Sequence, residues 1–84
     1  MPQSVTPIVE RIARVLAGQR LSSNAAGNDP SAADAVDRAW PDHVGDACAV
    51  LHTLREPDAA MASVGDVATW ERMVLAALDA EDAA

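Results

Sequence analysis

Hydrophobic side chains recur at three- and four-residue intervals along most of the chain, which is the spacing of one face of an α-helix. The clearest stripes fall in residues 7–18, 41–55 and 67 to 81. No alternating pattern typical of strands reaches a useful length. The pattern therefore predicts an all-α fold, a small irregular bundle of three main helices plus two short helices.

Capping residues and helix breakers predict where the main helices end. Thr6 followed by Pro7 is typical of an N-cap and a first helical position, and Gly18 predicts the end of the first helix. Residues 19–30 are rich in Ser, Asn, Gly and Pro, which favours a loop. Asp66 is a good N-cap for the last helix.

Two short helices complete the expected bundle. Ser31 and Asp34 have the spacing of a capping box, which predicts a helix over residues 31–39. Pro57 can begin a short helical turn that reaches Met61. Since 84 residues leave no room for a second core, we expect one helical domain over the whole chain, residues 1–84.

The triplet Arg55-Glu56-Pro57 interrupts the helical pattern after the third main helix. Pro57 disfavours the helical conformation at Glu56, so the helix should stop there. Arg55 then lies in the last turn, where its guanidinium can meet the final carbonyls or a carboxylate such as Asp58. We interpret the triplet as a structural corner and not as a catalytic site.

The stretch ACAVLHTLREPDAAM, followed by WERMVLAAL, resembles a signature of small uncharacterised helical proteins of alphaproteobacteria and their prophages. In that family a helix ending in Arg-Glu-Pro precedes a Met, a Gly and a Trp-x-x-Met-x-x-Ala-Ala-Leu helix. The resemblance covers residues 47–78, with Trp40 in the place of an upstream aromatic residue. It implies a shared fold and a prophage or mobile-element origin. It carries over no catalytic residue, because the family has no assigned activity.

The charge and the single cysteine narrow the range of partners and compartments. A net charge of -7 argues against binding nucleic acid, which requires clustered cationic side chains. Cys48 has no second cysteine to pair with, which favours a reducing compartment. No stretch approaches the ~18 apolar residues of a membrane span, and the N-terminus lacks a signal-peptide pattern. We therefore expect a cytoplasmic protein that does not enter membranes.

Residues that could carry chemistry do not form a recognisable site. Cys48 and His52 share one helix face at i,i+4, but two ligands do not make a metal site, and Cys48 is expected to pack as a small hydrophobe. His43 should face away from His52. We expect no enzyme activity, no metal and no cofactor.

Acidic residues are frequent between the first loop and the third helix. They lack the ligand order and central Gly of a calcium loop, so a solvated acidic face is the expected arrangement. These residues are Asp29, Asp34, Asp37, Asp42 and Asp46. On the first helix, Glu10 and Arg14 have the orientation of a stabilising i,i+4 pair.

The apolar faces of the first and last helices are wider than one packing contact requires. Nineteen of the 84 residues are Ala, and Phe and Tyr are absent, so the core should be thin. Self-association is a common source of stability for such short chains. We therefore expect a homodimer held partly by the last helix. The expected interface residues are Leu75, Ala68, Ala13 and Ala17.

Two function hypotheses follow from these patterns. The first is a non-enzymatic, self-associating protein–protein interaction module of prophage or mobile-element ancestry. The alternative is an acidic regulator that occupies the basic surface of a DNA-binding or restriction protein by phosphate mimicry. The alternative requires that the acids of residues 29–46 form a continuous strip.

Overall fold

The computed structural model describes residues 3–25 and 32–83, and every regular element in those ranges is a helix. The elements are α1 (Ile8–Ala25), α2 (Ala32–Ala39), the 3-10 helix η1 (Trp40–His43), α3 (Val44–Leu54), α4 (Ala59–Ala62) and α5 (Val67–Ala83). The prediction of an all-α fold is confirmed. The three main helices are α1, α3 and α5, and the two short ones are α2 and α4.

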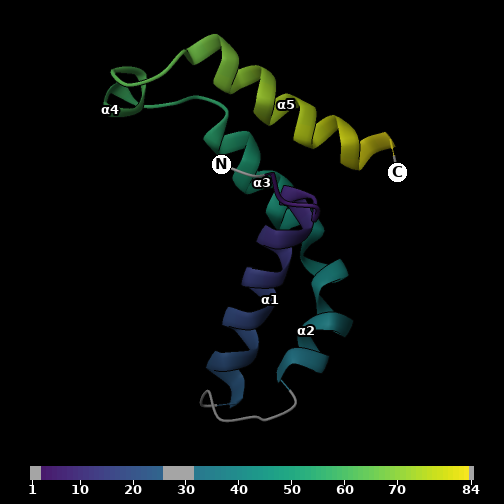
Figure 1. Ribbon diagram of the computed structural model, residues 1–84. Coiled ribbons are helices and arrows are strands. Elements are labelled where there is room, and N and C mark those ends of the chain that lie inside the picture. Colours follow the sequence, from purple (N-terminus) through teal and green to yellow (C-terminus); the bar gives the residue numbers. More distant parts are fainter. Residues whose placement is uncertain (1–2, 26–31, 84) are drawn as a thin grey trace.

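The helices form an elongated molecule with an arm at one end and a corner at the other (Figure 1). α1 and α2 pack side by side in the arm, α3 follows η1 at the centre, and α5 crosses beyond α3. The Cα radius of gyration is 15.0 Å, whereas a compact domain of this length has a radius of about 12 Å. The chain therefore leaves much of its helical surface uncovered.

The core lies where α1, α3 and α5 meet. Its buried residues are Val9, Ala13, Ala47, Leu51, Val74 and Leu78. The largest fully buried side chain among the described residues is Val9, while Trp40 and Trp70 lie at the margin of the core and are only partly buried. The core is therefore built from alanine, valine and leucine side chains, and the two tryptophans lie at its margin.

α1 continues without interruption past Gly18 to Ala25. The predicted helix end at Gly18 and the loop over residues 19–25 are therefore wrong, and residues 26–30 of that loop lie outside the described ranges. Packing explains the difference, because a Cβ at Gly18 would lie 3.8 Å from Cγ2 of Val36 on α2. α1 packs against α2, and tertiary packing of this kind overrides the local preference of a glycine.

Replacement of Gly18 by Ala is expected to raise the free energy of unfolding by about 0.5–1 kcal/mol, because Ala loses less backbone freedom in a helix. The added methyl group would meet Val36 at an ordinary contact distance. Thermal unfolding followed by circular dichroism at one fixed protein concentration measures the change. Gly45→Ala is the matched control, since a Cβ added at Gly45 would meet no other atom within 4 Å. Destabilisation by Gly18→Ala alone would mean that α1 and α2 lie closer together than described.

Arg14 joins α1 to α2. Its Nε lies 2.8 Å from Oε2 of Glu10, its Nη1 lies 2.6 Å from Oδ1 of Asp37, and its guanidinium carbon lies 5.4 Å from the ring centroid of Trp40. Its hydrogen bonds raise the pKa of Arg14 above its ordinary value, the bond with Asp37 more than the bond with Glu10. The expected Glu10–Arg14 pair is thus present, as one half of a wider ionic contact.

The other helix boundaries lie near their predicted positions, except that α3 begins at Val44 and not at residue 41, because residues 40–43 form the 3-10 helix η1. α1 begins at Ile8, one residue later than predicted, and the Pro7 carbonyl accepts a hydrogen bond from the Arg11 N–H at 3.1 Å. Pro41 lies in η1, which separates α2 from α3. The proposed capping residue Ser31 lies outside the described ranges. Over those ranges, no helix has both the length and the apolar content needed to cross a bilayer.

Candidate functional site: an apolar groove at the α4–α5 corner

The chain turns sharply after α3, at the triplet interpreted as a corner. Arg55 is the C-terminal capping residue of α3, and its N–H donates to the Leu51 carbonyl at 3.0 Å. Glu56 and Pro57 leave the helix, and Asp58 then caps α4 by accepting a hydrogen bond from the Met61 N–H at 3.0 Å. The structure thus places the triplet between two helices, with Pro57 on the inner side of the turn.

Asp66 caps the N-terminus of α5, as predicted. Its Oδ2 accepts a hydrogen bond from the Thr69 hydroxyl at 2.7 Å, and its Oδ1 accepts one from the Ala68 N–H at 3.1 Å. These hydrogen bonds lower the pKa of the Asp66 carboxyl below its ordinary value, and the bond from Thr69 has the largest effect. The carboxylate is therefore charged at neutral pH and complements the positive end of the helix dipole.

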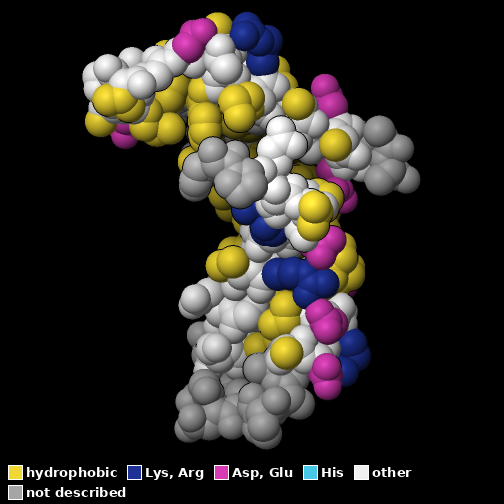
Figure 2. Space-filling view, in the orientation of Figure 1, with side chains coloured by type: hydrophobic (Ala, Val, Ile, Leu, Met, Phe, Trp, Pro, Cys, Tyr) yellow, Lys and Arg dark blue, Asp and Glu magenta, His cyan; other side chains and the backbone are white. Residues whose placement is uncertain are grey.

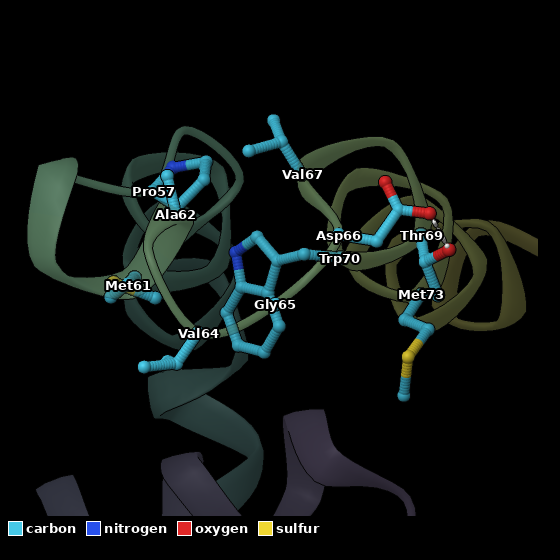
Figure 3. Close-up of a pocket in the computed structure, with 10 residues that line it drawn as sticks. All are labelled: Pro57, Met61, Ala62, Val64, Gly65, Asp66, Val67, Thr69, Trp70 and Met73. Carbon is cyan, nitrogen blue, oxygen red and sulfur yellow. Dashed lines mark hydrogen bonds between the residues drawn. The ribbon is translucent and has the colours of Figure 1, made fainter.

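An open groove of about 380 Å³ lies between α4 and the first turns of α5. Figure 3 shows the side chains that line it. The large apolar ones are Pro57, Met61, Val64, Val67, Trp70 and Met73. We call this feature the corner groove.

Trp70 occupies the centre of the corner groove in Figure 3, between side chains of α4 and Met73 of α5. Its indole Nε1–H donates to the carbonyl oxygen of Leu54 at 2.6 Å. That carbonyl belongs to the last turn of α3, where carbonyls lack partners within the helix. The bond satisfies the polar atom of the indole inside the chain, so the ring can offer apolar surface to the groove.

The side chains around the corner groove are unusually exposed for their size. Val64 is 87 % exposed, Met73 63 %, Val67 45 % and Met61 38 %. Figure 2 shows hydrophobic side chains gathered over α4 and the start of α5. Single exposed hydrophobic residues are common on protein surfaces, but a contiguous group around one hollow is typical of a binding surface.

The lining of the corner groove is almost entirely apolar. Asp66 is the one ionisable residue that lines it, and both of its oxygens are already engaged in capping α5. Methionine is flexible and polarisable, so Met61 and Met73 can adapt their shape to a partner. The lining therefore suits the apolar side chains of another polypeptide.

The other residues singled out for chemistry are not brought together. Cys48 is half-buried and packs against the core, whereas His52 on the same helix is exposed. His43 Nδ1 lies 3.9 Å from Oδ2 of Asp46. Within residues 3–25 and 32–83, no group of three or more His, Cys, Asp or Glu side chains is arranged to hold a metal ion.

Of the four expected interface residues, two are hidden inside the chain. Ala13 and Ala17 are fully buried on α1, so the expectation that they contact a second subunit needs correction. Small residues do permit close helix approach there, but the neighbours of α1 are helices of the same chain. On α5, Ala68 is exposed, and Leu75 is half-buried against the core.

The acidic residues give little support to the phosphate-mimicry alternative. Asp34 and Asp42 are exposed, but Asp37 between them is paired with Arg14 at 2.6 Å. One of the carboxylates that the alternative requires is therefore already paired with a cation of the same chain. Asp29 lies outside the described ranges.

Comparisons of this chain with protein-family models, with curated proteins and with solved structures find no match. The resemblance of residues 47–78 to small prophage-associated proteins stays a prediction. The inference of function therefore rests on the geometry and chemistry of the chain itself.

Proposed function

We propose that this chain is a non-enzymatic helical interaction module that acts by self-association, with a prophage or mobile-element ancestry. The observation that carries this proposal is the placement of its bulky side chains. Trp70, Met61 and Met73 surround an open groove, while the largest fully buried side chain in the described ranges is Val9. Aromatic residues and Met are enriched in the centres of protein–protein interfaces.

The accessible surface of the chain supports the same proposal. It amounts to 6124 Å². A folded monomer of 8.7 kDa exposes about 4,700 Å² according to the usual scaling with mass. The excess of about 1,400 Å² is larger than the ~800 Å² that each partner buries in a standard interface. A second polypeptide can therefore cover surface that the thin core leaves open.

Size-exclusion chromatography with multi-angle light scattering tests the proposal over protein concentrations of about 1 to 100 µM. We expect the mass to rise from that of an 8.7 kDa monomer to twice that value as the concentration increases. A mass that stays at the monomer value at about 100 µM would contradict self-association at any affinity useful for a dimer.

A further inference from the structure

The corner groove combines a hollow with side chains that project from its rim. Met61, Val67 and Trp70 line the hollow. Val64 and Met73 also line it, yet 87 % and 63 % of their surfaces are exposed, which makes them the most prominent apolar side chains there. A surface that carries both a hollow and projections of the same chemistry can be complementary to itself. Self-complementarity is the condition for a two-fold symmetric contact, in which both subunits use the same patch.

The charges next to the corner groove are also of both signs. Arg55 precedes the lining residues in the sequence and Arg72 is the neighbour of Met73, and neither arginine forms an ion pair within the described part of the chain. Arg72 donates instead to the Thr69 hydroxyl at 3.1 Å. Negative charge is supplied by Glu56, Asp58, Asp66 and Glu71. Asp58 and Asp66 cap their own helices, so Glu56 and Glu71 are the acids left to pair with Arg55 and Arg72 of a second copy.

From these observations, and resting on the proposed self-association, we infer that two copies of this chain pair through their corner grooves about a two-fold axis. Val64 and Met73 of each copy pack into the groove of the other, and Val64 lies close to the axis. Arg55 and Arg72 of one copy face the acidic side chains of the other. The uncovered start of α5, which extends beyond the three-helix core, is buried in this pair.

Met73→Glu and Val64→Glu place a charge in the inferred contact. Each is expected to weaken dimerisation about 30-fold or more, as loss of a central contact residue does. Val15→Glu is the matched control, because Val15 is 62 % exposed on α1, away from the corner. The dissociation constant of the Val15→Glu dimer should equal that of the wild-type dimer. All four proteins are compared by light scattering, and circular dichroism checks that each retains its helices.

A single-cysteine cross-link tests the symmetry. In a Cys48→Ala background, Val64→Cys should be joined to its own copy by a short bis-maleimide, since a two-fold axis brings the two positions together. Val15→Cys in the same background is the control and should not form a dimer on denaturing gels.

The outcomes separate the inference from the proposed function. A dimeric wild type whose Met73→Glu and Val64→Glu variants stay fully dimeric would overturn the inference and leave self-association intact. Loss of the dimer in both variants without a Val64→Cys cross-link would overturn the two-fold arrangement in favour of a head-to-tail contact. A wild type that is monomeric at every concentration would contradict both the two-fold pairing and the proposed self-association. Loss of the dimer together with the cross-link supports the inference.

Discussion

Leu51→Ala is expected to lower the free energy of unfolding by about 2–5 kcal/mol, the usual range for truncating a buried leucine. Leu51 is 4 % exposed and lies in the core cluster formed by α1, α3 and α5. Ala13 and Ala47 in that cluster are too small to fill the cavity. A domain of 84 residues has a total stability of roughly 4–13 kcal/mol, so the substitution removes a large share of it.

Chemical denaturation at one fixed protein concentration measures the effect of Leu51→Ala. Val50→Ala is the control, because Val50 is the adjacent residue of α3 and is 38 % exposed. Val50→Ala should lower the free energy of unfolding by less than about 1 kcal/mol, since it removes fewer carbons than Leu51→Ala and from a side chain that already contacts solvent. Equal losses in the two variants would mean that the core is not centred on the buried face of α3.

Ala47→Leu is expected to destabilise the protein by about 1–3 kcal/mol through overpacking. Ala47 is 0 % exposed and belongs to the same core cluster. The three added carbons cannot be accommodated unless α3 moves away from the helices that cover it. The expected result is a lower thermal midpoint and an earlier chemical transition.

Ala49→Leu is the matched control for Ala47→Leu, because it makes the same change two residues along α3 at an exposed position. Its effect on the free energy of unfolding should stay within about 0.5 kcal/mol. If Ala47→Leu were tolerated as well as Ala49→Leu, the close approach of helices at the buried alanines would be refuted.

The ends of helices are predicted correctly from the sequence where one local residue determines them. Asp66 caps α5 with its own carboxylate, and Pro57 stops α3, since both effects depend only on neighbouring backbone atoms. The prediction that α1 ends at Gly18 is wrong, because a glycine ends a helix only where no other helix packs against it. The packing of α1 against α2 at this position depends on residues distant in sequence, such as Val36, and is invisible to local rules.

The candidate site was harder to predict than the fold, because periodicity assigns a residue to a helix face but does not say which helix covers that face. Periodicity therefore predicts that a second subunit covers the wide alanine face of α1, whereas Ala13 and Ala17 are covered within the chain. Val67 and Met73 belong to the apolar stripe of residues 67 to 81, which periodicity alone assigns to the core. They are exposed because other positions of α5, such as Val74 and Leu78, make its contacts with the core.

The ionic contact between α1 and α2 makes one part of the fold sensitive to salt. Among residues 33–39 of α2, no side chain is fully buried, and the Arg14 and Asp37 side chains are 35 % and 61 % exposed. Dissolved ions screen such exposed pairs, whereas burial in the three-helix core is little affected. Opening of α2 therefore becomes easier as ionic strength rises, and its amide hydrogens exchange with solvent before those of α3.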